Sequence, residues 1–306
     1  REIRNLIIAA ILIAGAALLP LTGNGYLISI GVTIAMYTVL ATSWSLFSGP
    51  THYISLATAA FYGLGTLIVA FGIDVIPYPV LLLLSVVAGA IAAALVGLAT
   101  LRLSGVYFVI FTLGLAEMIR QLVSWLQNNI GGSRGLYVLT DITEEHIYWE
   151  LLTLAAVVFL LGWWIGRSKL GFAIRIIGND ETVAAHVGIN IAWSKVLLFM
   201  VSGMAASLVG ALLAPRWTYI EPNLAFSPLL SFEVVIMALL GGVHRLWGPL
   251  VGVIPFTILL EVIQANYPSQ TILVMGIAFL LIVYLVPHGV VGRLEELHAR
   301  LRRGQG

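Results

Sequence analysis

Residues 5–73 contain no Asp, Glu, Lys or Arg. A soluble domain does not sustain such a run, because about a quarter of its residues are charged. The stretch is long enough for three spans of about 20 residues each, the length that a helix needs to cross the hydrocarbon core of a bilayer. Charged residues make up only 9% of the whole chain, so the constraint extends beyond this stretch. The sequence therefore predicts an integral membrane protein.

The apolar runs predict helices rather than barrel strands. In a bilayer every backbone polar group must be hydrogen-bonded internally, which leaves helices or a closed barrel. The runs are continuous and rich in Leu, Ala, Ile and Gly, whereas barrel strands alternate apolar and polar residues. We expect an all-α, polytopic fold with about ten transmembrane helices, the third short or re-entrant. The expected spans are residues 5–21, 26–47, 54–71, 78–101, 105–126, 147–166, 191–214, 229–242, 249–266 and 271–287.

Orientation follows from Lys and Arg, which are enriched in cytoplasmic loops. With the first residues inside, most of these cations fall on inner segments, and the outer segments contain only Arg134 and Arg216. We therefore expect both termini in the cytoplasm. The expected domain organisation is a single transmembrane domain over residues 1–306, with a cytoplasmic loop at 167–190 and a basic cytoplasmic tail at 288–306.

The order of the spans allows an internal repeat. Spans two to five and seven to ten are offset by five, an odd number, so corresponding spans would run in opposite directions, as in inverted repeats. Residues 55–67 (SLATAAFYGLGTL) faintly resemble residues 202–212 (SGMAASLVGAL). Helices rich in small residues resemble one another in general, so an inverted repeat and a chance likeness both remain open.

Several classes of function are excluded by composition and motifs. A net charge of +1 provides no basic surface for nucleic acid. The absence of cysteine excludes disulfides, thiol catalysis and thiolate metal sites. Walker-type phosphate-binding sequences and the H-E-x-x-H metal motif are absent. We therefore expect no enzyme, and no metal or cofactor bound by this chain.

A polar segment, residues 166–190, interrupts the apolar second half of the chain. It carries Arg167, Lys169 and Arg175, which favour the cytoplasmic side. Its second half, residues 180–190, predicts a short amphipathic helix. An ordinary loop helix and a helix that docks onto a soluble partner both remain open from the residues alone.

The residues of this helix have distinct expected roles. Asp180 and Glu181 complement the dipole at a helix N-terminus, and Gly188 suits a helix C-terminus. Ala184 and Ala185 give a surface with little side-chain bulk, which a partner could approach closely. Together the segment follows the order E-x-x-A-A-x-x-G.

Charged residues within spans are expensive and are candidates for function. Glu117 and Arg120 are three residues apart and can pair on one helix face. Glu117, Glu233 and Glu261 are expected in the outer halves of their spans, where a zwitterionic amino acid would benefit from them. Buried ion pairs, or carboxylates that reach the outer interface, are the alternative interpretation.

The polar segment resembles the cytoplasmic loop of ABC importer permeases, specifically the branched-chain amino acid permease family. Three further stretches carry the resemblance: Gly131-Gly132-Ser133 followed by Gly135, residues 195–212 (KVLLFMVSGMAASLVGAL), and residues 239–252 (LLGGVHRLWGPLVG). The resemblance covers most of the chain from the second span onward. Within that family, the chain resembles the LivM-type subunit rather than the LivH-like one.

The resemblance implies a permease subunit that translocates branched-chain or other hydrophobic amino acids across a bacterial or archaeal cytoplasmic membrane. The implied partners are a LivH-like second permease subunit, two ATPase subunits that bind ATP and Mg, an external substrate-binding protein and the lipid bilayer. The residues implied in coupling to the ATPase are Arg175, Asp180, Glu181, Ala184, Ala185 and Gly188.

Two departures and two alternatives accompany this resemblance. Arg134 stands where a small or acidic residue is expected, and Asn190 and Lys195 stand where the general importer loop continues to a Leu-Pro. The cargo could instead be urea or a short amide. A stand-alone, proton-coupled secondary transporter would use Glu117, Glu233 or Glu261, but it has no need of an exposed Ala-Ala helix.

Overall fold

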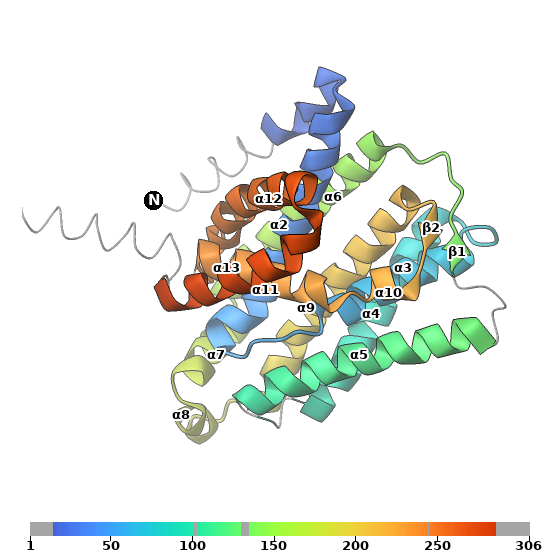
Figure 1. Ribbon diagram of the computed structural model, residues 1–306. Coiled ribbons are helices and arrows are strands. Elements are labelled where there is room, and N and C mark those ends of the chain that lie inside the picture. The colour runs from blue at the N-terminus through green and yellow to red at the C-terminus, as the bar shows by residue number, and fades with distance from the viewer. Residues whose placement is uncertain (1–14, 101–102, 104, 130–134, 244, 286–306) are drawn as a thin grey trace, which may run out of the picture.

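The computed structural model describes residues 15–100, 103, 105–129, 135–243 and 245–285 (Figure 1). These residues form helices joined by turns and extended segments, with two short strands that pair antiparallel, Leu136 opposite Ile220. The prediction of an all-α, polytopic membrane protein is confirmed. The elements are α2 (Gly25–Thr51), α3 (Thr58–Gly72), α4 (Tyr78–Thr100), α5 (Val106–Asn129), β1 (Leu136–Tyr137), α6 (Glu144–Arg167), α7 (Lys169–Asn179), α8 (Glu181–His186), α9 (Ile191–Leu213), β2 (Tyr219–Ile220), α10 (Pro222–Ala225), α11 (Pro228–Gly241), α12 (Gly248–Asn266) and α13 (Thr271–Leu285), with 3-10 turns at Leu19–Thr22, Ala214–Arg216 and Pro268–Gln270.

Seven helices of the described residues are long and apolar enough to cross a membrane, against the ten expected. They are α2, α4, α5, α6, α9, α11 together with α10, and α12. The third expected span is the 15-residue helix α3, and the tenth is the 15-residue helix α13. At 1.5 Å per residue each is about 22 Å long, shorter than the roughly 30 Å hydrocarbon core. Most of the first expected span lies outside the described residues.

The second expected span ends later than the sequence indicates. We expected it to stop at Phe47, ahead of Gly49-Pro50, but α2 continues to Thr51 with Pro50 inside it. Proline removes one backbone donor from a helix. The last turn is nevertheless held by the Thr51 hydroxyl, which donates to the Phe47 carbonyl at 2.6 Å, and by His52 N, which donates to the Ser48 carbonyl at 3.0 Å.

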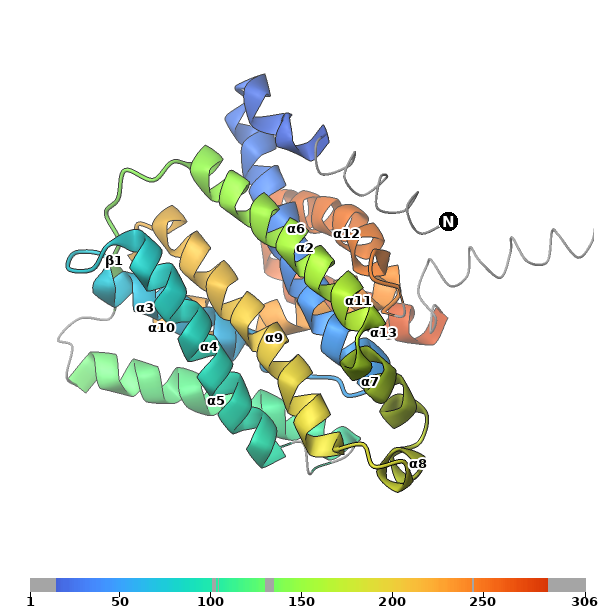
Figure 2. The ribbon, with the colours of Figure 1, turned by 180° about the vertical axis from the view of Figure 1, so that it is seen from behind.

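The bundle has two distinct ends. Figure 2 shows α4, α9 and α6 side by side, running from one end to the other, with α8 at one end and β1 at the opposite one. We call these the α7–α8 end and the β1–β2 end. Helix α5 lies along an edge of the bundle (Figure 1) and is the least buried of the seven candidate spans.

The helices α2 and α9 each pack against helices from the other half of the sequence. Helix α9 packs mainly against α3 and α4, whereas α2 packs against α6, α11 and α12, and α2 and α9 also contact each other. Glycines allow the close contacts, as expected for membrane helices. A Cβ atom added to Gly203 of α9 would lie 2.5 Å from the Cβ of Ala93 of α4. One added to Gly210 would lie 2.0 Å from the Tyr62 carbonyl oxygen of α3.

Candidate functional site

Three capping side chains divide the polar segment into two helices. Ser168 ends α6 and begins α7, where its hydroxyl accepts a hydrogen bond from Gly171 N at 3.3 Å. Asp180 begins α8, and Asn190 begins α9 by accepting from Trp193 N at 3.0 Å. Side chains of these types satisfy the free N–H groups of a first helical turn. The sequence predicted the helix after Asp180 but did not single out α7.

Asp180 holds the N-terminus of α8 as expected. Its Oδ1 atom accepts from the backbone N–H groups of Thr182 at 2.7 Å and Val183 at 3.3 Å. These hydrogen bonds favour the ionised form, so they hold the pKa of Asp180 below its usual value. The helix therefore begins with a carboxylate that complements its dipole.

Gly188 ends this helix in the left-handed region, with φ at +80°. The backbone then turns back, because Gly188 N donates to the Ala185 carbonyl and Ile189 N donates to the Ala184 carbonyl, both at 3.1 Å. Glycine adopts this conformation without steric cost. The predicted helix terminus at Gly188 is confirmed, and the helix itself is shorter than residues 180–190.

The two alanines of α8 face opposite ways. Ala184 is fully buried and belongs to the main hydrophobic core, whereas Ala185 is exposed. The expected low-bulk surface at both alanines is therefore wrong for Ala184, because a helix of this length turns consecutive residues to different faces. Ala185 is joined on the surface by Val183 and Val187, both more than half exposed. We call Val183, Ala185 and Val187 the α8 surface.

Arg175 lies in α7 and is used within the loop itself. Its Nε atom donates to the Gly171 carbonyl at 3.1 Å and its Nη2 atom donates to the Gly166 carbonyl at 2.7 Å. It thereby satisfies a carbonyl at the end of α6, where a cation also complements the helix dipole. Arg175 fixes the angle at which α7 leaves α6.

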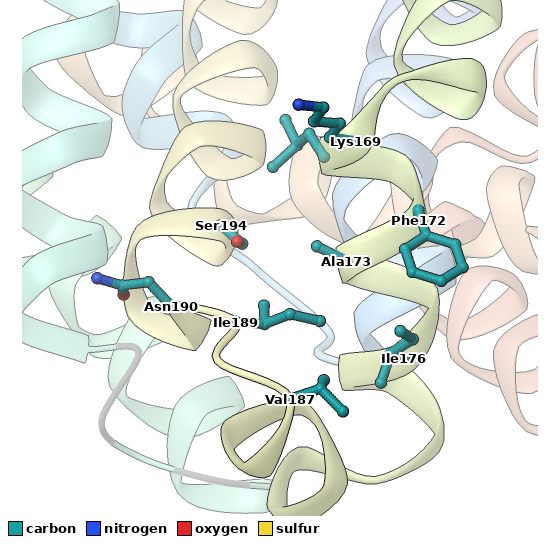
Figure 3. Close-up of a pocket in the computed structure, with 9 residues that line it drawn as sticks. Lys169, Phe172, Ala173, Ile176, Val187, Ile189, Asn190 and Ser194 are labelled. Carbon is teal, nitrogen blue, oxygen red and sulfur yellow. The ribbon is translucent and has the colours of Figure 1, made fainter.

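A groove separates α7 from the start of α9 (Figure 3). It has a volume of about 560 Å³ and mostly apolar walls. In Figure 3 the side chains of Ile176 and Ile189 lie across it from α7 and from the α8–α9 link. The lining residues are Lys169, Leu170, Phe172, Ala173, Ile176, Val187, Ile189, Asn190 and Ser194. Val187 belongs to both this groove and the α8 surface, so the two are continuous.

The loop is docked tightly on the rest of the chain. A Cβ atom added to Gly178 would lie 1.8 Å from the Pro50 carbonyl oxygen, so α7 touches the end of α2 backbone to backbone. On α8, Glu181 Oε1 lies 2.5 Å from Lys195 Nζ and accepts from the Tyr53 hydroxyl at 3.1 Å. In the sequence, Lys195 stood out only as a departure from the general importer loop. No local sequence pattern indicated a role for Tyr53, because its partner Glu181 is 128 residues away in the sequence.

The three candidate pathway glutamates lie in different surroundings. Glu117 is close to the middle of α5 rather than in its outer half, and it pairs with Arg120, whose Nε donates to Glu117 Oε2 at 2.8 Å. Glu233 is buried in α11 and accepts from the Tyr37 hydroxyl of α2. Glu261 is half-buried on α12.

The Glu117–Arg120 pair is partly exposed on the face of an otherwise apolar helix. Arg120 Nη1 also donates to Asn223 Oδ1 of α10 at 2.9 Å, and Gln121 Nε2 donates to Glu117 Oε1 at 2.9 Å. Charged groups at the middle of a span are costly against lipid and line water-filled paths or contacts with protein. We therefore expect the face of α5 that carries this polar cluster to contact protein or water rather than lipid.

Some sequence motifs fall outside the described residues. They are Gly131 to Arg134, His244 and the basic tail at 288–306. Gly135, which follows the first of these motifs, packs against Tyr219: a Cβ atom there would lie 2.4 Å from the Tyr219 ring. Metal-binding clusters of three or more His, Cys, Asp or Glu residues are absent from the part of the chain that the structure describes.

Comparisons with known proteins agree with this architecture. Residues 26–286 match the family described as branched-chain amino acid transport system / permease component. The chain is 22% identical over 339 aligned residues to the high-affinity branched-chain amino acid transport permease LivM of Salmonella typhimurium, with 99% of this chain and 78% of that protein covered. It is 26% identical to LivH of the same organism, over 54% of this chain and 53% of LivH. The chain thus spans about half the length of the LivH relatives that it matches.

A solved structure to which the chain is similar is PsaBC from Streptococcus pneumoniae in complex with Fab, with a TM-score of 0.49, 15% identity, and 90% of this chain and 97% of that chain covered. The family match covers nearly the whole described region, including α7, α8 and the helices before and after them in the chain. The chain belongs to the branched-chain amino acid transport permease family, as the motifs of its polar segment predicted.

Proposed function

We propose that this chain is a transmembrane permease subunit of an ABC importer that translocates branched-chain or other hydrophobic amino acids. The observation that carries the proposal is α8: a short helix, capped at both ends, that presents small and apolar side chains at one end of the bundle. The family match and the likeness to LivM along nearly the whole chain support the same conclusion.

In this proposal, α8 is the coupling helix and the α7–α8 end faces the cytoplasm. The charges support that orientation: Arg167, Lys169 and Arg175 lie at this end, whereas Glu144 and Glu145 lie at the start of α6, at the opposite end. Both termini would then be cytoplasmic, in a bacterial or archaeal cytoplasmic membrane. The ATPase subunits, two per transporter, would contact the α8 surface and bind ATP and Mg, which this chain does not.

The translocation path would lie between this chain and a second, LivH-like permease subunit. The polar cluster around Glu117 and Arg120 supports this, because it would otherwise face lipid at the middle of α5. Glu233 and Glu261 are then weaker candidates for the pathway than Glu117. Glu233 is buried against Tyr37, and Glu261 lies on a different helix. An external substrate-binding protein would deliver the cargo at the β1–β2 end.

The packing of the bundle supports an inverted repeat within one domain. Helices α2 to α5 would correspond to α9, α11, α12 and α13. The contacts follow this exchange: α9 packs on α3 and α4, as α2 packs on α11 and α12, and the pairs α3–α5 and α11–α13 both make contact. Each set also contains a short helix after its first long one, α3 and α11. Ten transmembrane helices would include the first expected span.

The test is purification of the full-length tagged chain in mild detergent from its native cells, followed by mass spectrometry. We expect two P-loop ATPases, a second permease subunit, and uptake of branched-chain amino acids that needs ATP in reconstituted vesicles. Uptake of urea or short amides with the same partners would reassign the cargo. A chain that purifies without ATPases and transports on a proton gradient would overturn the proposal in favour of a secondary transporter.

A further inference from the structure

Lys195 is a buried cation near the start of α9. Its side chain is 1% exposed, and its Nζ atom lies 2.5 Å from Glu181 Oε1 and 4.1 Å from the centre of the Tyr53 ring. A charge removed from water is stable only with a partner charge and good hydrogen-bonding geometry. The face of an aromatic ring adds attraction for a cation. Lys195 is therefore held by Glu181 on one side and by Tyr53 on the other.

The same carboxylate oxygen joins three separate elements. Glu181 is the first residue of α8, Lys195 belongs to α9, and Tyr53 lies in the extended segment between α2 and α3. Glu181 is itself 46% exposed, so a protein that binds α8 can reach it, whereas Lys195 cannot be reached from solvent. If α8 moved without α9, Lys195 would be left buried without its partner charge, Glu181. We therefore expect α9 and Tyr53 to move with α8.

From Tyr53 the contact continues to α5. The Tyr53 ring meets the Phe108 ring of α5 edge-on, with centroids 5.3 Å apart. Three residues farther along the chain, Leu56 N donates to Thr112 Oγ1 of α5 at 3.1 Å. Thr112 lies five residues before Glu117, which pairs with Arg120 in the polar cluster of α5.

We propose that Glu181, Lys195 and Tyr53 form the joint that transmits movement of α8 to α9 and α5. In this role all three are positioning residues, and none of them contacts the cargo. The inference rests on the proposed function, because it takes α8 as the element that the ATPases move. It adds a defined route, from Glu181 through Tyr53 to Phe108 and Thr112, by which that movement reaches the middle of α5.

The chain contains a matched control for this joint. Glu144 is the first residue of α6, is 42% exposed, and pairs at 3.1 Å with Arg216, which follows the other end of α9. Glu181 and Glu144 thus share residue type, helix position, exposure and a cationic partner at an end of α9. They differ in that only Glu181 belongs to α8, and in that the Lys195 side chain is 1% exposed whereas the Arg216 side chain is 22% exposed.

The experiment uses the complete transporter with a reporter on α5. Natural cysteines are absent from this chain, so Met118→Cys on the exposed face of α5 gives the chain a single site, and maleimide labelling of this chain can be timed with and without ATP. In this background we compare Lys195→Met, Glu181→Gln and Tyr53→Phe with Lys195→Arg and with Glu144→Gln. Each purified complex is also assayed for bound ATPase, ATP hydrolysis and uptake.

We expect ATP to change the labelling rate of the parent complex severalfold. Lys195→Met should abolish this change and lower the uptake per ATP hydrolysed at least about tenfold, while the ATPases stay bound. Glu181→Gln and Tyr53→Phe should give the same effect in weaker form, and Lys195→Arg should restore most of it. Glu144→Gln should keep the ATP-dependent labelling and the ratio of uptake to hydrolysis.

The outcomes separate the joint from the function on which it rests. A parent complex that lacks ATPases, or whose uptake does not need ATP, overturns the proposed function. A parent with ATP-dependent uptake whose Met118→Cys labelling ignores ATP overturns the joint alone. A parent that responds to ATP, with Lys195→Met responding equally, overturns the joint alone. If Lys195→Met does not insert, Tyr53→Phe decides: an unchanged response to ATP and an unchanged ratio of uptake to hydrolysis overturn the joint.

Discussion

Gly65 of α3 touches Ser207 of α9 backbone to backbone: a Cβ atom added to Gly65 would lie 1.7 Å from the Ser207 carbonyl oxygen. Neither backbone can shift without displacing a buried helix. Close approach of this kind provides much of the van der Waals packing between helices in a bilayer, where the hydrophobic effect does not drive helices together. At this point the α3–α9 contact therefore requires a residue without a Cβ atom.

Gly65→Ala should accordingly destabilise the chain by about 1–3 kcal/mol, the usual cost of overpacking. Gly114→Ala on α5 is the control, since an added Cβ there meets nothing within 4 Å. Alanine favours a helix over glycine, so the control should be neutral or slightly stabilising. Thermal unfolding in detergent measures both, and equal stability of the two variants would contradict the packing argument.

Ala185→Glu should uncouple transport while the chain remains inserted in the membrane. The substitution places an unpaired charge and extra bulk on the α8 surface, where a partner groove would have to bury it, and burying an unpaired charge is strongly unfavourable. We expect ATP-dependent uptake to fall more than about tenfold, with Ala185→Ser close to the parent. Normal uptake by Ala185→Glu would remove α8 as the coupling helix.

Glu117→Gln should reduce uptake less than Ala185→Glu does, because the amide can still accept from Arg120. Arg120→Gln should have the larger effect of the two, since it breaks the contacts to both Glu117 and Asn223. The KM and maximal rate of uptake in reconstituted vesicles provide the comparison. Uptake that becomes independent of ATP, or strictly dependent on a proton gradient, would contradict the importer mechanism.

Tyr37 and Glu233 should behave as one unit in unfolding experiments. The Tyr37 hydroxyl donates to the buried Glu233 carboxyl, so Tyr37→Phe removes a hydrogen bond from a polar group that water cannot reach. We expect a loss of about 1–3 kcal/mol in the free energy of unfolding. In a double-mutant cycle with Glu233→Leu, the double variant should lose less than the sum of the single losses. Strict additivity would show that the contact contributes nothing.

Asp180 should keep α8 capped in mildly acidic solution. Its pKa is lowered in the folded chain by the N–H groups of Thr182 and Val183. The stabilisation is therefore fully present above the pKa of the unfolded state, and it is lost as pH falls through the lower pKa of the folded state. Carboxyl NMR titration should find Asp180 ionised at a pH where the same residue in a peptide of residues 175–190 is already protonated. Identical titration in chain and peptide would contradict the capping role.

The sequence predicted features that depend on local chemistry. Long apolar runs predicted most of the spans to within a few residues, because burial in a bilayer requires an unbroken stretch. Asp180 and Gly188 predicted both ends of α8, since an N-cap carboxylate and a left-handed glycine act on their own turns. The motifs of the polar segment also predicted the family correctly.

Features that depend on distant residues could not be predicted. Ala184 and Ala185 are alike in sequence, and only the docking of α8 on the core makes one buried and the other exposed. Tyr53 meets Glu181 across 128 positions, and no local pattern encodes that contact.

The packing of α2 and α9 against helices from the other half of the sequence restricts how the chain can move. Helix α9 lies against α3 and α4, and α2 contacts α11 and α12 as well as α6. Helices from the two halves of the sequence therefore pack against each other, and we expect the chain to move as one unit. Opening and closing of a path through the membrane would then have to occur at the outer surface of this chain, with the whole subunit tilting against its neighbour. On this account, a single copy of the chain in a bilayer would contain no path for cargo.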